Sequence, residues 1–170
     1  MERSRDAHAI GLMRYYLIDK VHEMKPGVSA RGVKCATLTD EILHDHFPDY
    51  PMLPGALIVE GAAQLAGFLL EMSFNGDGRP LVRALLVQIH RAKFYEPVGP
   101  GDQIEISVRI DSTREESAQV DFDVMLGAKE VARGTLTFVL RPINSSRVHE
   151  QRRYVYALWT RDFSPPLVLP

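Results

Sequence analysis

Apolar residues fill the stretch from Ala56 to Leu70 with few polar interruptions. Because these residues cover nearly every side of a helix, the pattern predicts a buried helix rather than a surface one. Pro54 suits the first turn, since it has a fixed φ and no N–H to donate. The sequence Asn75-Gly76-Asp77-Gly78 predicts the end of the helix and a turn. Glu60 and Gln64 lie within the helix, one turn apart on the same face.

The pattern changes to a period of two after this helix, with apolar and polar residues alternating along three segments. Such alternation predicts antiparallel strands with one buried face and one solvent-exposed face. The run 81–89 is largely apolar and predicts a buried strand, whereas 94–102 holds two prolines and two glycines and predicts a loop. Pro26-Gly27 predicts the turn of an earlier hairpin. The expected strands are 15–24, 28–36, 81–89, 104–111, 118–124 and 132–140.

These elements predict an α+β architecture, with one long helix packed on the apolar face of an antiparallel sheet of five or six strands. Residues 3–13 could form a short helix. From Asn144 onward the pattern departs from the strands. It predicts a short amphipathic helix followed by an extended tail around Ser164-Pro165-Pro166.

Length and composition narrow the class of protein. The chain has 170 residues, 45% of them hydrophobic and 25% charged, which fits one globular domain. A net charge of −2 argues against a nucleic-acid-binding protein. Cys35, the single cysteine, cannot form an internal disulfide. The N-terminal sequence has no apolar run of the kind that marks a signal peptide. Glu60 and Gln64 argue against a membrane span. We therefore expect a cytoplasmic protein.

Glu60 is the residue that most needs an explanation, because a carboxylate inside an apolar helix is costly unless it is paired or protonated. His46 lies in the loop that runs into the same helix. Taken alone, His46 is more often a loop residue and Glu60 a satisfied core group. The combined spacing of His46, Pro54-Gly55, Glu60 and Gln64 favours catalysis. His44 lies outside this pattern, and the remaining histidines show no metal-ligand spacing.

The segment 46–55, His-Phe-Pro-Asp-Tyr-Pro-Met-Leu-Pro-Gly, followed by Glu60 and Gln64, resembles the signature of β-hydroxyacyl-ACP dehydratases of the FabZ/FabA type. Segments 16–21 and 92–103 also resemble that family. The resemblance implies the hot-dog fold, a curved antiparallel sheet wrapped around one long central helix. We expect this domain over residues 1–143, with 144–170 as a C-terminal extension. Glutamate at position 60 resembles the FabZ type, since the FabA type carries aspartate there.

The resemblance implies dehydration of 3-hydroxyacyl thioesters to trans-2-enoyl thioesters in fatty-acid-type biosynthesis. This reaction needs a base, an acid and a donor for the thioester oxygen. By resemblance, His46 is the base, Glu60 the acid, and the Gly55 N–H holds the carbonyl. Gln64 would orient the Glu60 carboxyl group. The expected substrate-binding residues are Gly55, Gln64, Pro54 and Phe47.

The resemblance also implies the partners. The substrate would arrive on acyl carrier protein, and the protein would be a homodimer or a trimer of dimers. His46 of one chain would then meet Glu60 of the other. No metal, organic cofactor, nucleic acid or membrane is implied. Two alternatives remain open at this point: a hot-dog acyl thioesterase, and a non-catalytic hot-dog protein that binds acyl chains.

Four positions or segments depart from the family pattern. Asp49 replaces a glycine, Met13-Arg14-Tyr15-Tyr16 replaces a His-Arg-x-Pro-Phe segment, and Tyr95-Glu96 replaces a basic pair. The extension from Asn144 has no counterpart in compact members. Its arginines could supply a basic surface for the carrier protein, or its helix could pack on the sheet or on a neighbouring subunit.

Overall fold

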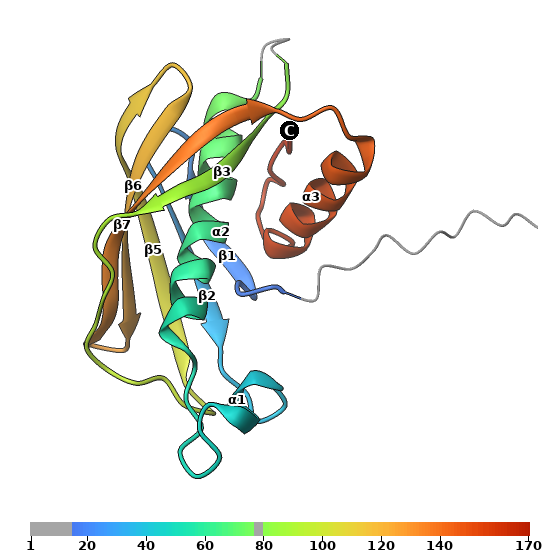
Figure 1. The fold of residues 1–170 in the computed structure, drawn as a ribbon. Coiled ribbons are helices and arrows are strands. Elements are labelled where there is room, and N and C mark those ends of the chain that lie inside the picture. The colour runs from blue at the N-terminus through green and yellow to red at the C-terminus, as the bar shows by residue number, and fades with distance from the viewer. Residues whose placement is uncertain (1–14, 77–79) are drawn as a thin grey trace, which may run out of the picture.

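The computed structural model describes residues 15–76 and 80–170 (Figure 1). Within these ranges the chain forms one antiparallel sheet of seven strands in the order β1-β2-β5-β6-β7-β3, with β4 paired to β7 beside β3. The strands are β1 (Lys20–Lys25), β2 (Ser29–Cys35), β3 (Val82–Ile89), β4 (Lys93–Phe94), β5 (Gln103–Arg114), β6 (Ser117–Leu126) and β7 (Lys129–Pro142). The helices are α1 (Ile42–Asp45), α2 (Gly55–Phe74) and α3 (Ser146–Trp159).

The sheet curves around α2, which runs along its concave face (Figure 1). The inward-facing side chains of β5, β6 and β7 form the core together with α2. Gly61 lets α2 lie close to the backbone of Leu17, because a Cβ at position 61 would be 3.1 Å from the Leu17 carbonyl oxygen. By length and composition α2 could cross a membrane, but 72% of its most apolar window is buried in the fold. It is therefore the core helix, and the expected curved sheet around one long helix is confirmed.

Several expectations for individual elements need correction. The sheet has seven strands rather than five or six, because residues 93–94 pair with β7 as a short strand. The loop before α2 contains the four-residue helix α1. The run 81–89 is a strand but not a buried one: Leu85, Leu86, Val87 and Ile89 are exposed, since β3 is an edge strand of the chain's own sheet. The helix expected at 3–13 lies outside the described residues.

The C-terminal helix α3 lies beside α2 (Figure 1). Its buried face consists of Val155, Tyr156 and Trp159. The Tyr156 ring stacks on Phe68 of α2 with 3.9 Å between ring centroids. The Ser145 side chain accepts a hydrogen bond from the Val148 N–H and caps the helix. The helix expected after Asn144 is present, and it packs on the rest of the domain.

Candidate active site

The loop before α2 fixes the ring of His46. The His46 Nδ1 lies 2.9 Å from the Met52 carbonyl oxygen, and the Met52 N–H donates to the His46 carbonyl oxygen over 2.8 Å. The ring stacks on Phe47, the next residue, at 4.3 Å between centroids. A carbonyl oxygen can only accept, so in the neutral imidazole Nδ1 carries the proton and Nε2 has the free lone pair. In this tautomer the Nε2 atom of His46 can accept a proton.

Glu60 is half-buried rather than enclosed, and its neighbour Gln64 holds it in place. The Gln64 Nε2 donates to Glu60 Oε1 over 3.0 Å and to the Tyr15 carbonyl oxygen over 3.0 Å. The Gln64 Oε1 accepts from the Leu17 N–H over 3.1 Å. These contacts fix the amide on three sides and orient the carboxyl group. Among the described residues, Glu60 Oε2 has no hydrogen-bond partner, so it is available to a substrate.

The first turn of α2 supplies backbone N–H groups beside these side chains. Pro54 is the N-cap, and its carbonyl oxygen accepts from the N–H groups of Leu57 and Ile58. The earlier N–H groups of a helix have no acceptor within it, and they carry the positive end of its dipole. Gly55 contacts the Phe94 ring so closely that a Cβ would lie 2.8 Å from it. Glycine at 55 thus keeps this helix end against β4.

A groove of about 790 Å³ lies next to the start of α2. Tyr15, Leu53 and Leu57 contribute apolar walls, while the segment 39–45 contributes polar ones. Leu57 precedes Glu60 by three residues and shares its helix face. The volume falls within the range of small-molecule sites, so an acyl group could lie against Leu57. Neither His46 nor Glu60 is among the described residues that line this groove.

The structure brings some of the expected site residues together and leaves others apart. Gln64 contacts Glu60, Phe47 contacts His46, and Gly55 follows directly from Pro54. Within the described part of one chain, no hydrogen bond or ion pair joins His46 to Glu60. The same residues contain no group of three or more His, Cys, Asp or Glu side chains placed to hold a metal ion.

A second carboxylate on α2, that of Glu71, is fully buried and was not among the residues predicted from the sequence. Its Oε2 accepts from Arg83 Nη1 and from the Tyr156 hydroxyl, each over 2.6 Å. Its Oε1 accepts from the Ala84 N–H over 3.2 Å. Burial, and then the negative charge of Glu71, raise the pKa of the Tyr156 phenol well above its ordinary value, so it stays a donor. The available signal was an acidic residue eleven positions after Glu60 in the same apolar stretch.

Solved structures define the class of fold. A hot-dog-like protein from Thermanaerovibrio acidaminovorans matches with a TM-score of 0.57 and 19% identity, covering 78% of this chain and 92% of that one. A Streptococcus mutans protein solved with acetyl CoA matches with a TM-score of 0.59 and 18% identity, over 82% of this chain and 99% of that one. The dehydratase heterocomplex ApeI:P from Xenorhabdus doucetiae matches with a TM-score of 0.55 and 20% identity, over 69% and 92%. These likenesses establish a hot-dog fold.

Sequence comparison then gives the family. The FabA-like domain model matches residues 12–135. The 3-hydroxyacyl-[acyl-carrier-protein] dehydratase FabZ of Clostridioides difficile is 31% identical, over 74% of this chain and 87% of the relative. That of Pediococcus pentosaceus is 35% identical, over 72% and 80%. The FabZ of Geotalea uraniireducens is 38% identical, over 55% of this chain and 64% of its own length. The chain belongs to the FabA-like family, as a dehydratase of the FabZ type, and the thioesterase alternative is not favoured.

Proposed function

We propose that this protein dehydrates 3-hydroxyacyl thioesters, carried on acyl carrier protein, to trans-2-enoyl thioesters. The observation that carries the proposal is a pair of fixed side chains with free reactive atoms. His46 has its Nδ1 tied to the Met52 carbonyl oxygen and Nε2 left free. Glu60 has Oε1 tied to Gln64 and Oε2 left free. The family membership of the chain supports the same reaction.

The proposed chemistry uses each group at a stated atom. His46 Nε2 removes the proton from C2 of the acyl group, and the electron pair moves toward the thioester carbonyl. The Gly55 N–H, at the positive end of α2, stabilises the negative charge on the carbonyl oxygen. Glu60 gives a proton to the C3 hydroxyl, the C3–O bond breaks, and water leaves. The products are the enoyl thioester and one water molecule.

We propose that the site is completed by a second copy of the chain. Within one chain, no hydrogen bond or ion pair among the described residues joins His46 to Glu60. Leu85, Val87 and Ile89 of β3 are 41%, 55% and 50% exposed on an edge strand. An exposed apolar edge strand is a template for pairing with another chain. A homodimer through β3 would bury these residues and bring His46 of one chain to Glu60 of its partner.

We also propose that this enzyme acts in the cytoplasm.

Mixing two inactive variants tests the shared site. In a two-fold dimer of His46→Ala and Glu60→Gln chains, one of the two sites keeps both a histidine and a glutamate. Each variant alone should be nearly inactive on a short 3-hydroxyacyl thioester. After unfolding together and refolding, the mixture should recover about a quarter of the wild-type enoyl formation, because half of the dimers are mixed and each has one intact site.

The assay should follow enoyl absorbance and free thiol in parallel. Enoyl product without thiol release is the expected wild-type result. Thiol release without enoyl product would instead identify a thioesterase. A mixture that stays as inactive as its two components would reject the shared site, provided that native mass spectrometry shows mixed dimers. A Glu60→Gln chain with full activity would reject the proposed mechanism itself.

A further inference from the structure

A half-exposed aromatic ring lies against the start of α2. Phe94, the second residue of β4, is 49% exposed. Its ring packs so closely on Gly55 that a Cβ at position 55 would lie 2.8, 2.9 and 3.1 Å from three of the ring carbons. One side of the ring therefore covers the first residue of the helix, while the rest of the ring is exposed.

The ring lies on the side of Gly55 to which the first N–H groups of α2 point. Every Cα–Cβ bond in a helix tilts toward the helix N-terminus. Because the Phe94 ring lies close to where a Gly55 Cβ would be, it lies at the N-terminal end of α2. The N–H groups of the first turn, which have no acceptor inside the helix, point to the same end. The ring is therefore a neighbour of the N–H group to which the thioester carbonyl is assigned.

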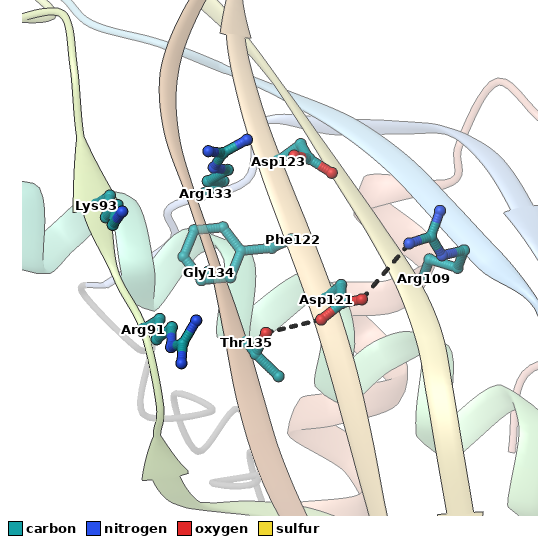
Figure 2. A pocket seen from close by; sticks show the side chains of 9 residues that line it. All are labelled: Arg91, Lys93, Arg109, Asp121, Phe122, Asp123, Arg133, Gly134 and Thr135. Carbon is teal, nitrogen blue, oxygen red and sulfur yellow. Dashed lines mark hydrogen bonds and ion pairs between the residues drawn. The ribbon is translucent and has the colours of Figure 1, made fainter.

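The backbone of β7 fixes the position of this ring. Phe94 pairs with Ala132 across the β4–β7 ladder, and the Tyr95 N–H donates to the Val131 carbonyl oxygen over 2.9 Å. Lys93, the preceding residue, lines a groove of about 350 Å³ on the convex face of the sheet (Figure 2). Successive residues of a strand point to opposite faces, so Phe94 faces α2.

The chain after β4 also fixes the loop that carries His46. The Leu53 N–H donates to the Val98 carbonyl oxygen over 2.7 Å, and Val98 is fully buried. Met52, the residue before Leu53, holds the His46 ring through its carbonyl oxygen. The segment 94–98 therefore holds the aromatic ring, the start of α2 and the proposed base together in one chain.

We propose that Phe94 is a positioning residue for the dehydration: its ring holds the thioester carbonyl against the Gly55 N–H and keeps water away from that N–H group. This inference rests on the proposed function, which assigns the carbonyl to Gly55. An N–H group at an exposed helix end binds water, and this water competes with a carbonyl oxygen. An apolar ring removes the competing water and lowers the local dielectric, so the N–H group stabilises the developing negative charge more strongly.

The test compares three Phe94 variants with the wild type on a short 3-hydroxyacyl thioester. Because the ring acts on charge that develops in the transition state, Phe94→Ala should lower kcat by about 10- to 100-fold and change KM much less. Phe94→Gln keeps a side chain over Gly55 but brings polar atoms to it, and should lose kcat in the same way. Phe94→Leu keeps an apolar side chain and should recover most of kcat.

Tyr95→Ala is the matched control. The Tyr95 ring is 45% exposed, close to the value for Phe94, and it follows Phe94 directly in the chain. It lies under the Arg133 guanidinium, 5.5 Å from the ring centroid, on the face of β4 away from α2. Tyr95→Ala should therefore keep the kinetics of the wild type.

Infrared spectroscopy of the bound product tests the same contact without turnover. Each protein is loaded with the trans-2-enoyl thioester, and the stretching band of its thioester carbonyl is recorded. A carbonyl that accepts from the Gly55 N–H is polarised, so in the wild type and in Tyr95→Ala its band should lie at lower frequency than in the free thioester. In Phe94→Ala and Phe94→Gln the band should return toward the frequency of the free thioester.

An unchanged kcat in Phe94→Ala and Phe94→Gln, or an equal loss in Tyr95→Ala, would overturn the proposal. A higher KM with an unchanged carbonyl band would also overturn it, because the ring would then contribute only affinity. Native mass spectrometry should show the same oligomer for Phe94→Ala as for the wild type, and a change would assign the ring to a subunit contact instead. A wild-type protein that forms no enoyl product would refute the proposed function, whereas an active wild type with equally active Phe94 variants would refute this inference alone.

Discussion

Two glutamates on the same helix of this protein differ in their burial and in their hydrogen bonds. Glu60 and Glu71 lie eleven residues apart on α2, which is about three turns, and so share one face of the helix. Glu71 is fully buried and accepts three hydrogen bonds, from Arg83, Ala84 and Tyr156. Glu60 is half-buried and, among the described residues, accepts one bond from Gln64.

The difference indicates what each carboxylate is for. A buried carboxylate whose two oxygens both accept hydrogen bonds from the protein is enclosed by its own partners, so Glu71 fits a structural role. A carboxyl group with one oxygen oriented and the other free suits proton transfer. Variants at the two ends of α2 can therefore test the two roles separately.

Removal of α3 should have the largest effect. A chain ending at Pro142 loses Tyr156 and Trp159, and it leaves Phe68 and the Glu71–Arg83 pair uncovered. Loss of each buried aromatic contact alone costs about 3–5 kcal/mol, so the shortened chain should not fold stably. Circular dichroism and thermal melting would measure this. A shortened chain with the same melting temperature as the full chain would show that α3 does not stabilise the end of α2 that carries Glu71.

Arg83→Ala should destabilise the protein by about 3–5 kcal/mol, because it leaves Glu71 as an unpaired buried charge. Denaturant titration would measure the loss. The double variant Glu71→Leu/Arg83→Met removes both charges and should recover most of the stability. If the double variant were less stable than Arg83→Ala, the ion pair itself would be stabilising and the interpretation of Glu71 would need revision.

Tyr156→Phe should cost about 1–3 kcal/mol, because Glu71 loses a donor in a buried site. It should also change the dependence on alkaline pH. Folding raises the pKa of Tyr156, so above about pH 10 the unfolded state releases a proton that the folded state keeps. Wild-type stability should therefore fall by about 1.4 kcal/mol per pH unit from this residue, and the variant should lack that part of the slope. Tyr154→Phe, at an exposed position of α3, is the control.

Glu60→Gln should change stability by only about 0.5 kcal/mol or less, since the side chain is half-buried and keeps its shape. Its expected effect is on turnover, where losing an acid–base group lowers kcat by about 10²–10⁴-fold. Stability and dehydration rate measured on the same sample would check both parts. A large loss of stability would place Glu60 with Glu71 as a structural residue.

The sequence predicted the fold because its main signals are local. The all-round apolar pattern of α2 and the alternation in β5, β6 and β7 each depend on near neighbours along the chain. The motif also predicted that Gln64 would orient Glu60, and the two side chains are hydrogen-bonded. The roles of His46, Glu60 and Gly55 in catalysis stay predictions.

The features that the sequence did not predict depend on contacts between residues that are far apart in the chain. Glu71 could not be matched to Arg83 and Tyr156, because they come from different elements and no local pattern pairs them. The apolar run of β3 could not be recognised as an exposed edge, since an apolar strand has the same pattern whether its own core or another chain covers it.

The amide of Gln64 connects the beginning of the described chain to the glutamate one helical turn away. It contacts the backbone of Tyr15 and Leu17 with the same group that orients Glu60. Any fusion partner or tag that displaces this backbone would turn the amide and move the carboxyl oxygen with it. An affinity tag on this protein therefore belongs at the other terminus, and rates measured with a leading tag should be compared with those of the untagged chain.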